Sequence, residues 1–213
     1  MAYPLPEGIS YDEATFLDGL GVALRAVARS GLRPMEDVVV LGAGPIGALI
    51  LRVARAYGAR RVFCTEISER AMEIAQTVGA NDVMDARGMD VVSAVMERTE
   101  GFGVDVVFNT VGSLESQQEE LRMLAGGDGW VVLAVKSDEL SFDATLISGE
   151  RTITTTANSL YADFQLAIDL MASERVNVAP LITHRFPLEQ GVKAFATALN
   201  REKTGAVKVI IQS

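Results

Sequence analysis

Short apolar runs alternate with stretches of helical periodicity through the middle of the chain. Residues 38–41 form a β-branched run that Gly42 closes, and apolar positions between residues 46 and 57 follow the spacing of a helix. The same pattern recurs as far as residue 156. The predicted strands are residues 38–41, 61–65, 82–84, 104–108, 130–135 and 152–156; the predicted helices between them are 46–57, 69–78, 90–99 and 113–124, with a turn at 126–129. Strands joined by single crossover helices predict an α/β fold, a doubly wound six-stranded parallel sheet with helices on both faces.

The two ends of the chain depart from this alternation. A helix is predicted over residues 11–30 with Gly31 as its C-cap, two more over residues 161–173 and 188–200, and a last strand over 207–211. We therefore expect a helical flank (residues 1–30), a central sheet unit (31–158) and a C-terminal segment (159–213) related to a second domain.

Composition excludes several classes of function. The chain has 213 residues, 49% hydrophobic and 22% charged, which is typical of a soluble globular protein. Its net charge of −9, without a cluster of basic residues, argues against a nucleic-acid partner. Cys64 and His184 are the only residues of their types, so a disulfide framework or a Cys/His zinc site is not expected. With no long apolar run and no signal-peptide pattern, we expect no membrane contact and a cytoplasmic location.

A glycine motif lies between the first predicted strand and its helix. Gly42, Gly44 and Gly47 match G-x-G-x-x-G, in which the first glycine permits a tight turn, the second lets the backbone approach a pyrophosphate, and the third allows close packing of helix on strand. The N–H groups at the start of the helix then face the phosphates. Because Pro45 lacks an N–H group, we expect Ile46 and Gly47 to donate. The motif predicts a dinucleotide site.

The end of the second predicted strand indicates which dinucleotide binds. Glu66 stands there, where a carboxylate accepts the ribose hydroxyls of an adenosine and repels a 2′-phosphate. This favours NAD over NADP, although Arg70 follows nearby. The ends of two further strands, residues 109–112 and 134–136, meet the same edge of the sheet and are candidates for a nicotinamide pocket.

Several segments together resemble one family. These segments are residues 14–18, 38–47, 79–82, 104–112, 181–188 and 206–209. They resemble the medium-chain, zinc-dependent alcohol and polyol dehydrogenases, with sorbitol, threonine and butanediol dehydrogenase-like members nearest. The resemblance implies a Rossmann fold and hydride transfer between NAD(P) and a secondary alcohol or ketone. Only the cofactor-binding half and the C-terminal segment are matched, so we expect this chain to bind NAD with little or no turnover, and zinc to belong to a catalytic domain that the chain lacks.

The resemblance also implies roles for individual residues. The pyrophosphate would meet Gly42, Gly44, Ile46 and Gly47 beside Pro45, and the ribose would meet Glu66. The nicotinamide side would be lined by Thr110, Val111 and Ala134, together with Val135, where relatives usually carry glycine. Lys208 corresponds to a basic residue that reaches the cofactor phosphate, and Asp18 to a glutamate near the zinc. The segment containing His184 corresponds to a turn, and the Thr-rich strand 152–156 to an edge that pairs in a homodimer.

Two other functions remain open at this point. The same fold serves non-catalytic nucleotide-sensing or protein-interaction modules. S-adenosylmethionine-dependent methyltransferases also place glycines after their first strand, although the complete glycine motif argues against them. Cys64, inside a predicted strand, is expected to be a small buried hydrophobe.

Overall fold

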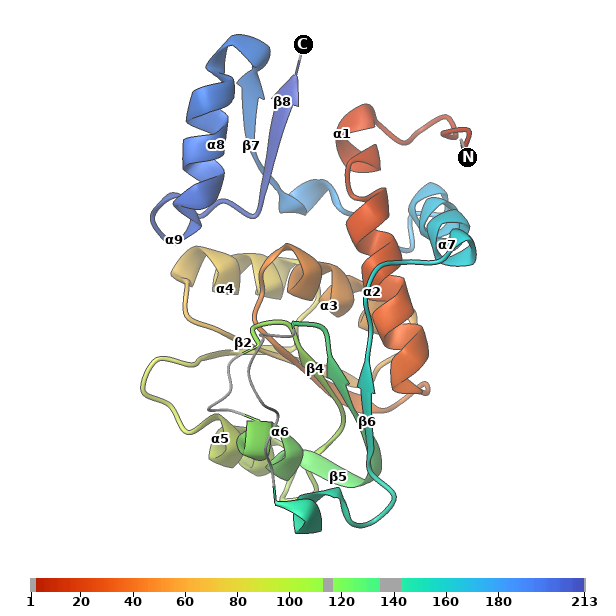
Figure 1. The fold of residues 1–213 in the computed structure, drawn as a ribbon, viewed down its shortest axis with the longest axis vertical. Coiled ribbons are helices and arrows are strands. Elements are labelled where there is room, and N and C mark those ends of the chain that lie inside the picture. Colours follow the sequence, from red (N-terminus) through yellow and green to blue (C-terminus); the bar gives the residue numbers. More distant parts are fainter. Residues whose placement is uncertain (1–2, 113–116, 135–142, 213) are drawn as a thin grey trace.

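A six-stranded parallel sheet forms the centre of the protein in a computed structural model, which describes residues 3–112, 117–134 and 143–212 (Figure 1). The strand order is β3-β2-β1-β4-β5-β6, and every neighbouring pair is parallel. The strands are β1 (Asp37–Leu41), β2 (Arg61–Glu66), β3 (Asp82–Asp85), β4 (Val104–Asn109), β5 (Leu124–Val132) and β6 (Thr152–Thr155). The strand order reverses between β1 and β4, which is where doubly wound sheets bind their ligands. The predicted fold class is confirmed.

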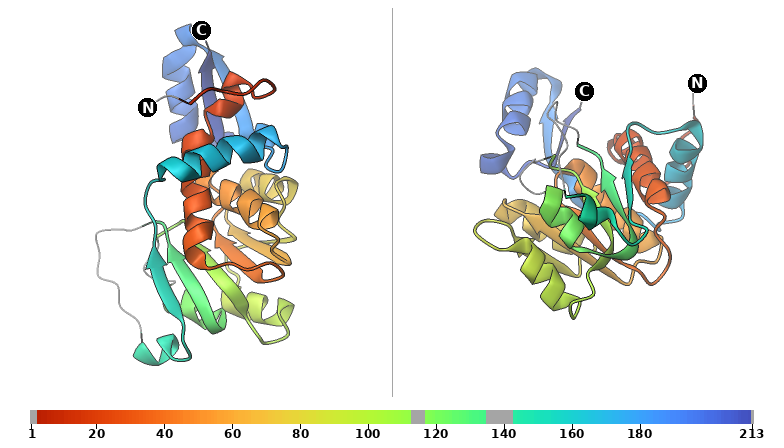
Figure 2. Two further views of the ribbon diagram at one scale, coloured as in Figure 1. Left: turned by 90° about the vertical axis from the view of Figure 1, so that its right-hand side faces the viewer. Right: turned by 60° about the horizontal axis from the view of Figure 1, so that its bottom comes forward.

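Helices cover both faces of this sheet. On one face lie α2 (Leu17–Ser30), α3 (Pro45–Ala56), α4 (Glu69–Thr77) and α7 (Tyr161–Ala172); on the other lie α5 (Val91–Arg98) and α6 (Gln117–Arg122) (Figures 1 and 2). The side chains of β1 point alternately to the two faces of the sheet, so that Val38 and Val40 pack with the first group of helices and Val39 packs with the second. All three valines are fully buried, as expected for a parallel strand covered on both sides.

A second, smaller sheet lies beyond α3 and α4 (Figures 1 and 2). Its two parallel strands are β7 (Ile182–Pro187) and β8 (Lys208–Gln212), joined through η3 (Leu188–Gln190), α8 (Gly191–Leu199) and α9 (Arg201–Thr204). We call residues 182–212 the C-terminal lobe. The prediction of a turn around His184 is wrong, because this residue lies within β7, opposite Val209 of β8. The helix expected over residues 188–200 begins with a 3-10 turn and continues as α8.

The helix predicted over residues 11–30 is interrupted. It consists of α1 (Tyr11–Ala14) and α2, separated by Thr15 and Phe16. The Thr15 hydroxyl donates to the Asp12 carbonyl at 2.7 Å, which ends α1 locally, and Phe16 is buried in the core. Gly31 is the left-handed C-cap of α2, as predicted.

The glycine-rich run at residues 126–129 is not a turn ahead of β5. It lies inside β5, where the register with β4 shifts, since Val104 pairs with Leu124 but Val106 pairs with Gly129. The extra residues form an irregular bulge, which glycine tolerates. Two 3-10 segments, η1 (Ala144–Ile147) and η2 (Ala179–Leu181), complete the described elements.

Candidate cofactor site

The glycine loop turns sharply from β1 into α3. Gly42 has a φ of +89°, and its N–H donates to the Thr65 carbonyl of β2 at 2.8 Å. A Cβ atom on Gly47 would lie 2.0 Å from the Gly42 carbonyl oxygen, a distance that no side chain tolerates. Gly44 is the N-cap of α3 in extended conformation, and Pro45 occupies the first turn, where its missing N–H costs no helical bond. The loop therefore forms a close cradle that only glycine permits at Gly47.

Glu66 braces this cradle from the end of β2. Its Oε2 accepts the N–H of Ala43 at 2.8 Å, and its Oε1 accepts those of Ile67 and Ser68 at 2.7 and 3.1 Å. The carboxylate thus ties the glycine loop to the β2–α4 turn. Sequence reasoning placed Glu66 correctly at the strand end but did not anticipate this bracing role.

The segment after β4 forms the opposite wall. The Thr110 hydroxyl donates to the Leu41 carbonyl at 2.7 Å, and Val111 lies so close that a Cβ on Gly42 would approach its Cγ1 to 2.7 Å. A Cβ on Gly112 would lie 2.9 Å from that of Ala134, two residues after the end of β5. The structure therefore brings Thr110, Val111 and Ala134 into one neighbourhood.

A buried polar pair fixes that segment. Asn109 and Glu120 expose 1% and 0% of their surface, and the Asn109 Nδ2 group donates to both carboxylate oxygens of Glu120 at 2.9 Å. The amide oxygen is thereby turned toward the backbone, where it accepts the N–H groups of Val111 and Gly112 at 3.0 and 2.8 Å. The sequence marked Asn109 only as one of the candidates at residues 109–112 and gave no role to Glu120, so the bond between the two is seen only in the structure.

These walls enclose a cavity of about 480 Å³ at the carboxyl edge of the sheet. Six of the predicted residues line it, namely Gly42, Gly44, Pro45, Glu66, Thr110 and Val111. Ile46 and Gly47 lie in the first turn of α3 and Ala134 lies behind Gly112, so these three are near but do not line it. Val135 lies outside the described residues.

Lys208 lies away from the residues that line the cavity. Its Nζ donates to the Thr15 carbonyl at 2.9 Å and sits 4.9 Å from the centroid of the Phe16 ring. Burial lowers the pKa of Lys208, and the nearby Asp18 charge opposes that shift. Lys208 does not line the cavity, so its contact with cofactor phosphate stays a prediction.

The C-terminal lobe supplies residues that sequence reasoning missed. Arg201, Gly205, Ala206 and Val207 line the cavity opposite the glycine loop. The Arg201 Nη1 atom lies 3.6 Å from the position that a Cβ of Gly44 would occupy. No sequence signal links residues 201–207 to the motif, because their approach depends on how the lobe folds back over α4.

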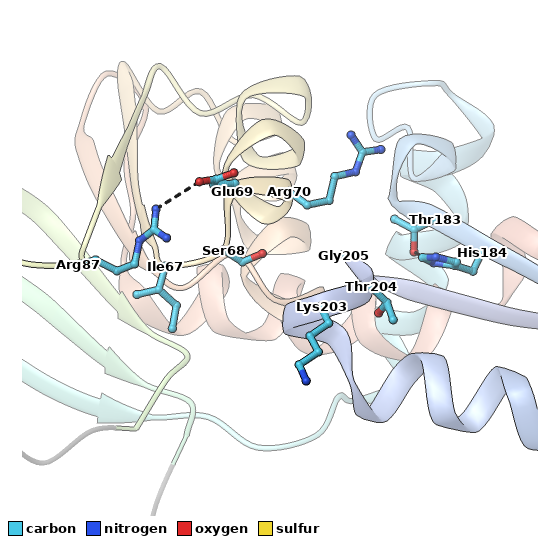
Figure 3. Close-up of a pocket in the computed structure, with 10 residues that line it drawn as sticks. All are labelled: Ile67, Ser68, Glu69, Arg70, Arg87, Thr183, His184, Lys203, Thr204 and Gly205. Atoms are coloured by element: carbon cyan, nitrogen blue, oxygen red, sulfur yellow. Dashed lines mark hydrogen bonds and ion pairs between the residues drawn. The ribbon is translucent and has the colours of Figure 1, made fainter.

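A second pocket of about 550 Å³ adjoins the first where the lobe faces the start of α4 (Figure 3). Its basic residues include Arg70, Arg87 and Lys203, and the two arginines are paired. Arg70 Nη1 lies 2.6 Å from Glu73, and Arg87 Nη2 lies 2.6 Å from Asp85, which lowers the pKa of Asp85 to about 2.

His184 also lines the second pocket, with its Nδ1 3.0 Å from the Thr183 hydroxyl oxygen. Cys64 is fully buried in β2, as predicted, and burial raises the pKa of its thiol.

Comparison with known proteins identifies the family. A model described as zinc-binding dehydrogenase matches residues 45–173, more than half of the chain. This chain belongs to the zinc-binding dehydrogenase family. That membership confirms the resemblance and contradicts the methyltransferase alternative.

Individual proteins also match most of this chain. A probable D-xylulose reductase A from Aspergillus clavatus is 33% identical over 198 residues, which are 91% of this chain and 55% of the relative. Sorbitol dehydrogenase from Ovis aries is 30% identical over 213 residues, 99% of this chain and 59% of the relative. A putative zinc-binding dehydrogenase from Sinorhizobium meliloti 1021, solved bound to NADP, is 26% identical with a TM-score of 0.90 over all of this chain and 63% of its own. The chain thus spans little more than half the length of its curated relatives and covers the cofactor-binding part.

The family name raises the question of whether this chain holds zinc. Within residues 3–112, 117–134 and 143–212, no three His, Cys, Asp or Glu side chains gather closely enough to ligate a metal. The described residues therefore do not fit a zinc site, whereas the glycine cradle does fit a dinucleotide. Among the helices of these same ranges, none has the length and apolar character that a membrane span requires.

Proposed function

We propose that this chain binds NAD and is the cofactor-binding part of an oxidoreductase that moves a hydride between NAD and a secondary alcohol or ketone. The observation that carries the proposal is the cradle at Gly42–Gly47, where a Cβ on Gly47 would collide with the Gly42 carbonyl at 2.0 Å. Such close backbone packing leaves helix N–H groups facing the cavity, as pyrophosphate binding requires. When bound, NAD supplies the hydride acceptor.

The residues of the cavity divide the cofactor between them. We assign the glycine loop to the pyrophosphate, Glu66 to the adenosine ribose, and Thr110, Val111 and Ala134 to the nicotinamide. Val135, outside the described residues, stays a candidate for the nicotinamide side on the sequence alone. A carboxylate has about four acceptor sites. Backbone N–H groups occupy three on Glu66, which leaves room for one ribose hydroxyl. No three ligand-type side chains gather into a zinc site among the described residues, so we expect this chain alone to show little or no turnover.

The charge balance around Glu66 favours NAD over NADP. The carboxylate would face a 2′-phosphate, and the arginines of the neighbouring pocket, Arg70 and Arg87, are already paired with Glu73 and Asp85. Isothermal titration calorimetry with both nucleotides tests the proposal. We expect saturable one-site binding, tighter for NAD, and no alcohol oxidation. Tighter NADP binding overturns the choice of cofactor, absence of binding overturns the proposed function, and turnover by this chain overturns the claim of inactivity.

A non-catalytic nucleotide sensor remains the second candidate, because the described residues offer a cofactor cavity without a metal site. Binding of another protein that depends on added NAD would favour it. The division at residues 30/31 and 158/159 and the cytoplasmic location stay predictions.

We also propose that the protein forms a homodimer through β6. Only β5 pairs with β6 in the described chain, and Thr152 and Thr155 are exposed. The Thr156 N–H points to Val132 of β5, so the N–H of Thr155 points to the outer edge of β6, where the Thr155 carbonyl accepts a hydrogen bond from Arg29 Nε at 2.8 Å. We expect a dimeric mass by light scattering at micromolar concentration, a monomeric mass for Thr155→Pro, and a dimer for Thr155→Ala. A monomeric wild-type protein contradicts the proposal.

A further inference from the structure

The glycine loop has few free backbone donors. The Gly42 N–H donates to Thr65, the Ala43 N–H donates to Glu66, and Pro45 has none. The N–H groups of Gly44, Ile46 and Gly47 remain for a pyrophosphate that carries two negative charges. The protein itself has a net charge of −9. A side-chain cation beside the loop would therefore contribute strongly to binding.

Arg201 occupies that place. Its guanidinium Nη1 lies 3.6 Å from the Cβ position of Gly44, and the residue lines the cavity with Gly42 and Gly44. Within the described part of the chain, the Arg201 side chain has no hydrogen bond and no ion pair. Two other nearby cations are engaged, since Arg70 is paired with Glu73 and Lys208 donates to Thr15.

The turn that carries Arg201 is fixed at both ends. The Gly205 N–H donates to the Arg201 carbonyl at 2.8 Å, and the Thr204 hydroxyl donates to the Thr197 carbonyl of α8 at 2.9 Å. Gly205 has a φ of +66° and packs so tightly on α4 that a Cβ there would approach Arg70 Cγ to 2.5 Å. The lobe therefore holds the backbone of Arg201 close to the first sheet, while its side chain stays free to bind.

We propose that Arg201 binds the pyrophosphate of the cofactor, the role that the family resemblance assigns to Lys208. This inference rests on the proposed function. The planar guanidinium matches two phosphate oxygens at once, which a lysine does not. The C-terminal lobe then acts as the second half of the dinucleotide site.

Three ligands and four variants test this role. The ligands are NAD, ADP-ribose, which keeps the pyrophosphate, and adenosine, which lacks it; calorimetry measures each Kd. For Arg201→Ala we expect binding of NAD and ADP-ribose to weaken by about 10- to 100-fold, the range of a charge-assisted hydrogen bond. Adenosine binding should change less than about twofold. Arg201→Lys should recover part of the loss.

A matched control and a rival variant separate this contact from general charge. Lys203→Ala removes the same charge from the same short helix and should stay within about threefold of wild type. Lys208→Ala removes the residue favoured by the resemblance and should weaken NAD binding less than Arg201→Ala does. Equal weakening by Lys203→Ala or a larger loss with Lys208→Ala overturns the inference, as does an unchanged Arg201→Ala. If the wild type binds adenosine but neither pyrophosphate ligand, or binds nothing, the proposed function itself fails. Circular dichroism melting confirms that each variant is folded.

Discussion

The central sheet and the C-terminal lobe differ in how far their apolar side chains are buried. Around the sheet, large side chains such as Leu24 and Trp130 are fully buried between strands and helices. On the lobe, Val192, Phe195 and Leu199 follow one face of α8 and remain 88%, 68% and 81% exposed. The sheet is thus closed on both faces by described residues, whereas the lobe presents an open apolar face. The cofactor cavity lies where the two regions meet. One of its walls is formed by the strand ends of the well-packed sheet, and the other is formed by the lobe.

Truncating one residue in each region tests this contrast most strongly. Leu24→Ala removes a fully buried side chain of α2, and we expect the free energy of unfolding to fall by about 2–5 kcal/mol. Phe195→Ala removes an exposed side chain and should change it by less than about 0.5 kcal/mol. Urea denaturation measures both. An equal cost for Phe195→Ala would mean that the face of α8 is covered in solution, and the comparison would fail.

The glycine loop provides the next largest effect. In Gly47→Ala the new methyl group would meet the Gly42 carbonyl, so backbone must shift, and we expect a loss of about 1–3 kcal/mol in stability. NAD binding should weaken beyond about 100-fold, because the N–H groups of the cradle would turn away. Calorimetry and urea denaturation give the two values.

Gly44→Ala is the control for stability, since the nearest atom to its Cβ position is Arg201 Nη1 at 3.6 Å. It should fold as wild type does. A stable Gly47→Ala protein with unchanged NAD affinity would remove the basis for calling the loop a cradle.

The contrast between the central sheet and the lobe also explains which features could be predicted from the sequence. The strand-and-helix alternation, the motif and Glu66 are local signals, because β1, its turn and α3 are contiguous and their apolar periodicity reports burial directly. Arg201 reaches the cavity through a contact between distant segments, and the Asn109–Glu120 pair depends on how α6 packs against the end of β4. Apolar periodicity predicts neither contact. Strand β7 was not predicted, because its residues are at most partly buried. They also show no alternation of apolar and polar residues strong enough to distinguish a strand from a turn.

The smallest effect concerns the contact between the lobe and α1. Arg185 of β7 donates to Asp12 at 2.7 Å, and Gln212 of β8 donates to it at 3.1 Å; these bonds, led by that from Arg185, lower the pKa of Asp12 against the opposing effect of burial. A carboxyl whose pKa is lower in the folded state stabilises the fold above its unfolded pKa of about 3.9. The stabilisation from Asp12 is lost as the pH falls through the pKa that Asp12 has in the folded protein. Exchange of those amides of β8 that bond to β7 should therefore accelerate below about pH 4 in the wild type, and already at neutral pH in Asp12→Asn, while exchange at Val39 in β1 stays slow. If exchange in β8 follows that of β1 under both changes, the lobe is held by its packing on α4 rather than by Asp12.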